Sequence, residues 1–143
     1  MEELKREEEN LAIENINLPL NIFSTELGTL ETLAKYLKEN LGFSFSSIAS
    51  LLNRDPRTIW GAYDGAMEKH PEPFFGIPET AIELPVGMLR DRHFGMLENL
   101  VWHMHENLGM RYSRIATLIK RNDRTVWTAW MRARNKRTAY GLQ

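Results

Sequence analysis

The chain has 143 residues, of which 43% are hydrophobic and 26% charged, so it is too apolar to remain disordered. No apolar run approaches the ~18 residues that a membrane span needs, and the first residues are acidic rather than signal-like. We therefore expect a cytoplasmic protein that does not enter a membrane. Cysteine is absent, which excludes disulfides and thiolate metal sites.

The net charge of −1 conceals a strong asymmetry along the chain. Residues 1–85 hold 7 Lys/Arg against 15 Asp/Glu, whereas residues 86–143 hold 11 against 4. The second part therefore has the charge that binding to a polyanion requires. The alternative is that the acidic and basic parts attract each other, within one chain or between two subunits.

Two segments precede the first predicted helix. Residues 1–15 are an acidic arm with few apolar positions, which suits a solvated helix, a disordered arm or a contact helix completed by a partner. Residues 16–22 alternate apolar side chains around a proline, and this pattern favours an extended segment.

The first helix is predicted over residues 24–40. Apolar residues from Leu27 to Leu41 recur at helical spacing, which indicates one buried helix face. Gly42 follows, and glycine readily takes the left-handed conformation that ends helices. The helix is therefore expected to stop there.

Two further helices are predicted before residue 70. Ser44 or Ser46 is expected to cap a short second helix that carries an apolar stripe. After a turn, Asp55 is expected to cap a third helix that begins with Pro56, because proline suits the first helical position. The first repeat therefore covers residues 16–70.

Residues 71–81 are predicted to form a linker, and residues 82–143 a second repeat that is similar to the first. Three prolines and a glycine prevent a helix in the linker, and its two phenylalanines suggest that it packs against the protein. Residues 28–69 match residues 95–136 at 19 of 42 positions, which implies one structural unit used twice.

Each repeat has an extended lead-in, at residues 16–22 and again at 82–86. The two lead-ins can pair with each other or with a second subunit, provided that helices pack on them, because an isolated strand pair is marginal in water. Alternatively, each lead-in runs as coil over its own helices. The sequence leaves these arrangements open.

The second and third helices of each repeat resemble a known family. Residues 44–60 read Ser-Phe-Ser-Ser-Ile-Ala-Ser-Leu-Leu-Asn-Arg-Asp-Pro-Arg-Thr-Ile-Trp, and residues 112–127 repeat the pattern. It is similar to the helix-turn-helix domains of the sigma-factor region 4 and response-regulator effector type. In those domains Ser and Ile-Ala precede a short turn, and Thr-Val opens the recognition helix. The resemblance implies an all-α fold of two tandem trihelical helix-turn-helix repeats, each preceded by an extended segment.

The turn departs from the family pattern. The family places a glycine or a similar residue in the turn and a hydrophobic residue after it, whereas this chain has Asn53-Arg54 and Lys120-Arg121. Asparagine tolerates a left-handed conformation, but lysine does so poorly. We therefore expect a looser or longer turn than the standard one.

The resemblance implies that the third helix of a repeat enters the major groove of DNA. In the second repeat the residues expected to contact DNA are Arg114, Arg121, Arg124, Thr125, Thr128, Arg132 and Arg134. In the first repeat they are Arg57 and Thr58, which stand among glycines and acids that would repel phosphate. The second repeat is therefore predicted to be the better DNA binder. The first is expected to dimerise, to dock a protein or to touch the DNA backbone lightly.

Structural roles compete with some of these assignments. Arg57 and Arg124 occur in both repeats, so they can instead form ion pairs with Glu31 and Glu98 or with Glu39 and Glu106. The tryptophans at positions 60 and 127 lie next to the buried stripe. They are expected to complete a core or a seam between repeats rather than to stack on a base.

We expect neither a catalytic site nor a metal or cofactor site. His103 and His105 are two residues apart and point away from each other on a helix, and the usual zinc spacings are missing. No glycine-rich phosphate loop or nucleophile elbow is present.

These patterns predict a protein that binds double-stranded DNA as a transcriptional regulator or a small architectural factor, with a homodimer as a plausible state. The rival hypothesis is a non-enzymatic adaptor or assembly protein. Such a protein would use the same fold for protein contacts or for self-association, with its acidic and basic parts engaging head to tail.

Overall fold

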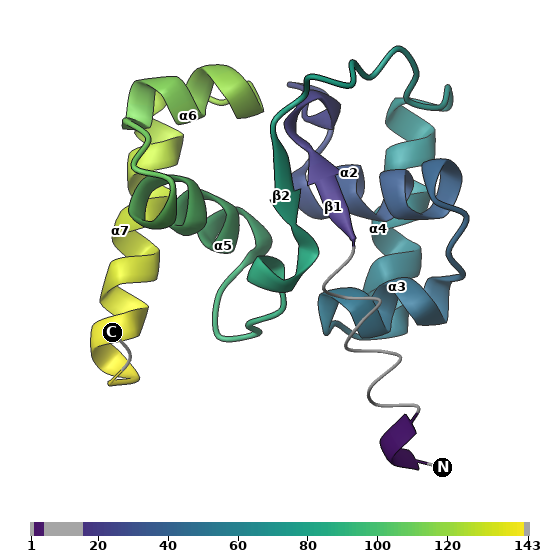
Figure 1. Ribbon diagram of the computed structural model, residues 1–143, viewed down its shortest axis with the longest axis horizontal. Coiled ribbons are helices and arrows are strands. Elements are labelled where there is room, and N and C mark those ends of the chain that lie inside the picture. Colours follow the sequence, from purple (N-terminus) through teal and green to yellow (C-terminus); the bar gives the residue numbers. More distant parts are fainter. Residues whose placement is uncertain (1, 5–15, 142–143) are drawn as a thin grey trace.

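The computed structural model describes residues 2–4 and 16–141, and most of it is helical. Figure 1 shows two similar helical halves, each led by a short strand and a helical turn. This confirms the predicted all-α tandem architecture. The acidic arm predicted over residues 1–15 lies outside the described residues, apart from residues 2–4. No helix of the described part is long and apolar enough to span a membrane.

The first half contains a short strand, a 3-10 turn and three helical segments, the first of which ends in a wider π turn. In chain order these are β1 (Asn17–Pro19), η1 (Leu20–Ile22), α2 (Thr29–Lys35) with η2 (Tyr36–Asn40), α3 (Phe45–Leu52) and α4 (Pro56–Lys69). The second half has the same order: β2 (Glu83–Pro85), η3 (Val86–Leu89), α5 (Met96–Trp102) with η4 (His103–Asn107), α6 (Tyr112–Ile119) and α7 (Asp123–Ala139).

The first helix begins at Thr29, so the predicted start near residue 24 was wrong. Gly28 is the N-cap, and its amide donates to the Glu31 carboxylate at 2.8 Å. Leu27 is buried although it lies in the loop before the helix. Its burial extends the apolar pattern beyond the helix, which explains the error.

The predicted helix ends and caps are confirmed. Gly42 has a φ of 75°, the left-handed value expected after the first helix. Ser44 rather than Ser46 caps α3, with its hydroxyl accepting from the Ser47 amide at 3.2 Å. Asp55 caps α4 ahead of Pro56.

The turn between the second and third helices is tight in both repeats, so the expectation of a looser turn was wrong. Asn53 and Lys120 both take the left-handed conformation, with φ values of 55° and 56°. The following amides close the turn in the same way. Arg54 donates to the Ala49 carbonyl at 2.9 Å, and Arg121 to the Ala116 carbonyl at 3.0 Å.

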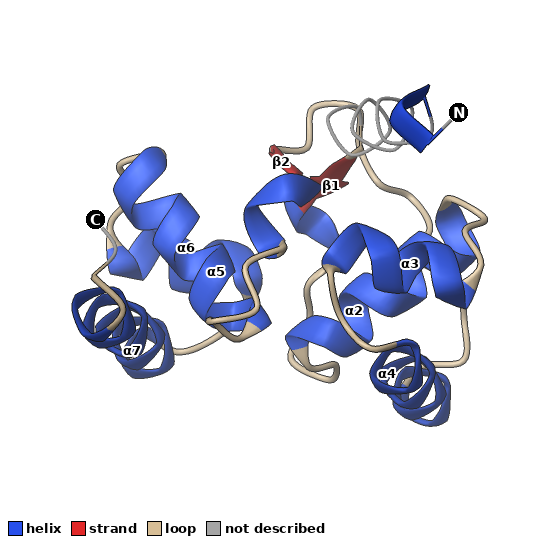
Figure 2. Cartoon of the chain, turned by 90° about the horizontal axis from the view of Figure 1, so that it is seen from below, coloured by secondary structure: helices blue, strands red, loops and turns tan. Residues whose placement is uncertain are grey.

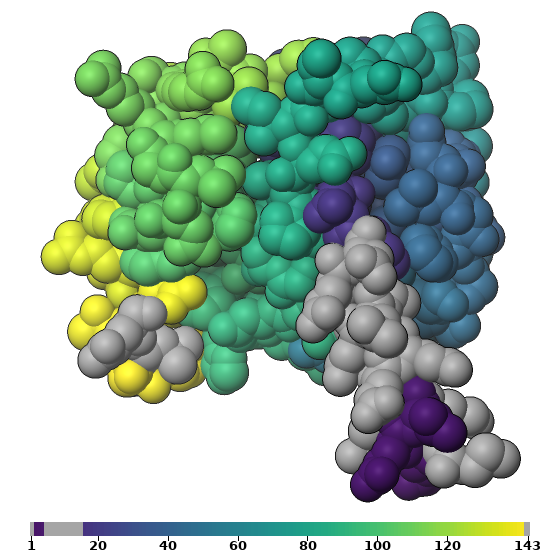
Figure 3. Space-filling model, viewed as in Figure 1, coloured from purple at the N-terminus to yellow at the C-terminus, as the bar shows by residue number. Residues whose placement is uncertain are grey.

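The two lead-ins pair with each other, which decides between the arrangements that the sequence left open. Strands β1 and β2 are antiparallel, with Leu18 opposite Leu84. The Leu20 amide donates to the Ile82 carbonyl at 2.9 Å to extend the pairing. In the space-filling view the strand segments lie between the blue first repeat and the green and yellow second repeat (Figure 3). The strands therefore join the halves into one body.

The linker packs against the first repeat at only one of its two phenylalanines. Asn40 donates to the Phe74 carbonyl at 3.0 Å, and the ammonium of buried Lys35 lies 5.6 Å from the centre of the Phe74 ring. Phe75, in contrast, is 84% exposed. The predicted packing thus holds for Phe74 and was wrong for Phe75.

Candidate nucleic-acid interface

Helix α7 is held on the protein by an apolar stripe and by polar contacts of Trp130 and Lys136, which bind Glu106 at 2.8 Å and Glu98 at 2.6 Å. Val126, Ala129 and Ala133 are buried, and they recur at helical spacing on the side that faces α5 and α6. Asn122 caps the helix, since its side chain accepts from the Thr125 amide at 2.7 Å. The side of the helix that contains the exposed Arg124 and Arg132 is available to other molecules.

This available surface is strongly basic. Helix α7 contains five Lys or Arg residues against one Asp. Within the described residues, the exposed side chains of Arg124 and Arg132 make no hydrogen bond or ion pair. Two guanidinium groups on one helix are therefore free to bind an anion.

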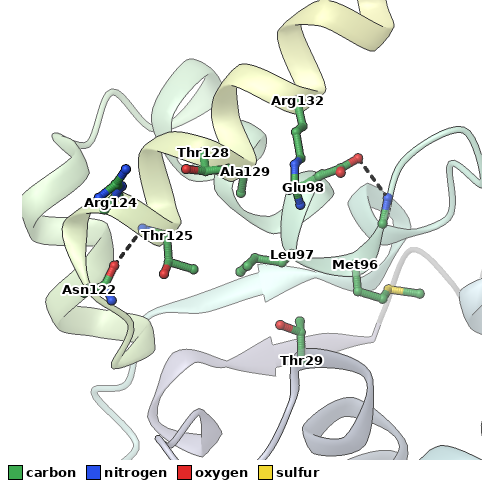
Figure 4. Close-up of a pocket in the computed structure, with 11 residues that line it drawn as sticks. Thr29, Met96, Leu97, Glu98, Asn122, Arg124, Thr125, Thr128, Ala129 and Arg132 are labelled. Atoms are coloured by element: carbon green, nitrogen blue, oxygen red, sulfur yellow. Dashed lines mark hydrogen bonds between the residues drawn. The ribbon is translucent and has the colours of Figure 1, made fainter.

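A shallow hollow of about 600 Å³ lies along one side of α7. In Figure 4, Thr125 and Arg132 project from α7 toward Leu97 and Glu98 of α5, and Thr29 of the first repeat closes the opposite side. Arg124, at the start of α7, also lines the hollow. Three of the expected DNA-contacting residues on α7, namely Arg124, Thr125 and Arg132, thus lie around one hollow.

Three of the other expected contacts lie around α7. Arg114 on α6 is exposed, and so is Arg134, whose guanidinium lies 5.5 Å from the centre of the Trp130 ring. Thr128 is half-buried and lines the hollow. These positions remain compatible with a surface centred on α7.

Arg121 has a different role from the one predicted. Its guanidinium donates to the Leu27 carbonyl at 2.6 Å and also to the Ser24 carbonyl. Both acceptors belong to the first repeat. Arg121 is therefore a link between the repeats, and we remove it from the proposed interface.

In the first repeat, α4 occupies the position that corresponds to α7 but has balanced charge. Its two Lys or Arg residues are matched by two acids. The Arg57 side chain is 94% exposed, with its Nε 3.5 Å from Asp55, and Thr58 is exposed beside it. A hydrogen bond from the Arg57 amide lowers the pKa of the Asp55 carboxyl below its usual range. The ionised Asp55 carboxylate offsets part of the charge of Arg57.

The structural alternative for the shared arginines was wrong, because other groups bind the four glutamates. Lys69 pairs with Glu31 at 2.9 Å, and Lys136 pairs with Glu98 at 2.6 Å. The remaining two glutamates bind Lys35 and Tyr63 in the first repeat and Trp130 in the second. Arg57 and Arg124 are thus left at the surface.

The tryptophans shared by the two repeats are exposed, so their predicted place in a core or seam was wrong. Trp60 on α4 is 57% exposed and Trp127 on α7 is 48% exposed. Each follows a buried residue, Ile59 or Val126, and one residue along a helix turns the side chain by about 100°. That angle was the signal in the sequence that could have placed them at the surface.

The histidines do not form a metal site in the described part of the chain. No group of three or more His, Cys, Asp or Glu side chains is positioned there to hold an ion. Burial lowers the pKa of His103 below its usual value, which favours the neutral form at pH 7.

Comparison of the chain with protein-family models, with curated proteins and with solved structures finds no match. The resemblance to sigma-factor region 4 and response-regulator effector domains therefore stays a prediction. The function has to be argued from the geometry of the two third helices.

Proposed function

We propose that this chain binds double-stranded DNA through α7, as a transcriptional regulator or small architectural factor of the cytoplasm. The single observation that carries the proposal is the pair of exposed guanidinium groups on α7, those of Arg124 and Arg132, which make no hydrogen bond or ion pair within the described residues. The tight turn between α6 and α7 supports the proposal, because helix-turn-helix proteins join their recognition helix to the preceding helix by such a turn.

The chemistry of these side chains suits a duplex. Arginine binds phosphate oxygens as a charged donor, and its guanidinium can donate two hydrogen bonds to the O6 and N7 atoms of guanine. Thr125 and Thr128 supply hydroxyl and methyl groups, which can contact either phosphates or a thymine methyl. Arg124 lies in the first turn of α7, the part of a recognition helix that reaches base edges.

Fluorescence anisotropy with a labelled random-sequence duplex tests this proposal. The protein is titrated into the duplex at several salt concentrations, beside an Arg124→Ala/Arg132→Ala variant. We expect binding that weakens steeply with salt, because displaced counterions drive association with DNA. The double variant is expected to bind at least about tenfold more weakly and with a shallower salt dependence.

A matched control removes charge elsewhere on the surface. The Lys38→Ala variant loses one positive charge from the first repeat at a position outside both third helices, and it is expected to bind within about threefold of the unchanged protein. If no duplex binds at micromolar protein in low salt, the proposal is wrong. It is also wrong if Lys38→Ala weakens binding as much as the change in α7 does.

The exposed tryptophans favour a second candidate, an adaptor that uses the third helices for protein contacts. Aromatic residues are enriched at protein interfaces, and Trp60 and Trp127 occupy the same position in both repeats. Sedimentation of the protein without DNA separates the two functions. Self-association that is lost in Trp60→Ala/Trp127→Ala, together with an absence of DNA binding, would support the adaptor.

A further inference from the structure

The two repeats are related by an internal two-fold arrangement centred on the strand pair. Leu18 and Leu84, which are equivalent in the two lead-ins, lie opposite each other. The flanking bonds are reciprocal, because the Leu20 amide donates to Ile82 at 2.9 Å and the Val86 amide donates to Ile16 at 3.0 Å. In these two flanking bonds, the donor and the acceptor of one repeat thus have their counterparts in the other repeat.

The same reciprocity extends to the turns of both helix-turn-helix units. Arg54 of the first repeat donates to the Phe94 carbonyl of the second at 2.9 Å. Arg121, its equivalent, donates to Leu27, which is the equivalent of Phe94, at 2.6 Å. Each arginine therefore anchors the turn of its own repeat to the loop before the first helix of the other repeat.

This arrangement places both third helices on one face of the molecule. Figure 2 shows α4 and α7 end-on along the edge opposite the strands, one beneath each repeat. Dimeric helix-turn-helix proteins use a two-fold arrangement of this kind to place two recognition helices in major grooves one helical turn apart, about 10 bp. Here a single chain supplies both helices.

The spacing between α4 and α7 is fixed by the packing. One buried cluster runs from the first repeat through Leu18 and Leu84 into the second, and it includes Ile59 of α4 and Val126 of α7. A continuous core of this kind allows neither repeat to rotate without exposing apolar surface. The two helices are consequently held as a rigid pair.

The two helices differ in what they present. Equivalent pairs on the available surface are Arg57 and Arg124, Thr58 and Thr125, Gly61 and Thr128, Asp64 and Met131, and Gly65 and Arg132. The arginine and threonine at the start of both helices can contact DNA in the same way. Beyond that first turn α7 offers a further cation and larger side chains, whereas α4 offers glycines and an acid.

We propose that one chain binds a single duplex across two successive major grooves, with α7 on a strong half-site and α4 on a weaker half-site of different sequence. This inference rests on the proposed DNA binding and adds the stoichiometry, the spacing and the asymmetry of the site.

The test begins with a duplex selected from a random library by the full chain. Hydroxyl-radical footprinting is expected to show two protected patches about 10 bp apart, and sedimentation is expected to show one chain per duplex. Insertion of 5 bp between the patches should weaken binding at least about tenfold, because the second helix then faces away from its groove. Insertion of 10 bp should also weaken it, since a rigid pair cannot stretch.

A variant of α4 identifies the weaker half-site. Arg57→Ala/Thr58→Ala is expected to lose one protected patch and to become insensitive to both insertions, while α7 still protects its own patch. One patch with the unchanged protein, tolerance of the 5 bp insertion, or two chains per duplex would each overturn this inference and leave DNA binding intact. Failure to bind any duplex would overturn the proposed function as well.

Discussion

Arg54 and Arg121 occupy positions where the resembling families place a hydrophobic residue. In this chain each guanidinium instead reaches main-chain carbonyls of the other repeat, at 2.9 Å for Arg54 on Phe94 and 2.6 Å for Arg121 on Leu27. The departure from the family pattern therefore marks the contact between the repeats.

Arginines 121 and 124 are three residues apart, and their replacement is expected to have opposite consequences. Arg121→Ala leaves the Ser24 and Leu27 carbonyls without their donors and should lower the free energy of unfolding by about 1–3 kcal/mol. Arg124→Ala removes an exposed side chain without a partner, and its effect on stability should stay within about 0.5 kcal/mol. Urea unfolding followed by circular dichroism measures both. Equal losses of stability would contradict the assignment of Arg121 to the contact between repeats.

The sequence was least informative about individual side chains. The acceptors of Arg121 lie 94 and 97 residues away, and no local pattern predicts such a contact. Trp127 is exposed because it follows the buried Val126 and its side chain is rotated by one residue around the helix axis. An aromatic residue beside a buried stripe was nevertheless expected to be buried. Arg124 and Arg132 were placed correctly at the surface, because they follow the period of the buried stripe.

Among the elements, the turn between α6 and α7 contains an unfavourable backbone conformation that the surrounding packing stabilises. Lys120 adopts the left-handed conformation, with a φ of 56°, at the position where the resembling families use a residue such as glycine. A non-glycine residue pays roughly 1–2 kcal/mol for this conformation. The packing of α6 and α7 against each other and the closing bond from the Arg121 amide hold the turn in place.

Replacing Lys120 by glycine is expected to stabilise the protein by about 1 kcal/mol, because glycine adopts the left-handed conformation without the steric cost. The control is Arg114→Gly, inside α6, which should destabilise the protein by about 1 kcal/mol. Thermal unfolding of both variants measures the two shifts. A lower midpoint for Lys120→Gly would show that the turn is not strained.

Elements with local signals were predicted well. The caps at Ser44 and Asp55 and the stop at Gly42 depend on residues within three positions of the helix end, so the sequence contains them in full. The start of α2 was missed because Leu27 is buried from a loop. The pairing of β1 with β2 stayed open, since three-residue strands have almost no intrinsic preference for a partner.

At the scale of the whole molecule, the repeats share one hydrophobic core. The buried cluster includes Leu33 and Ile48 of the first repeat, Leu100 and Ile115 of the second, and the strands between them. A shared core couples the stability of its parts, as in other small single domains. The repeats are therefore expected to unfold together.

Tryptophan fluorescence tests this coupling. In a Trp60→Phe background the remaining three of the four tryptophans lie in the second repeat, so fluorescence reports on that repeat alone. Adding Ile59→Ala under α4 should cost about 2–5 kcal/mol and move the fluorescence and circular dichroism transitions together to lower urea. A fluorescence transition that does not move would show that the repeats unfold independently.

Because both paired strands belong to one chain, their pairing does not depend on the protein concentration. Two separate subunits obey mass action, so their paired form disappears as the protein becomes scarce. Here the partner strand belongs to the same chain, and its effective concentration is set by the linker rather than by the number of molecules in the cell. Under the proposed binding of one chain to one duplex, occupancy of the duplex is expected to follow the first power of the protein concentration, which gives a graded response rather than a threshold.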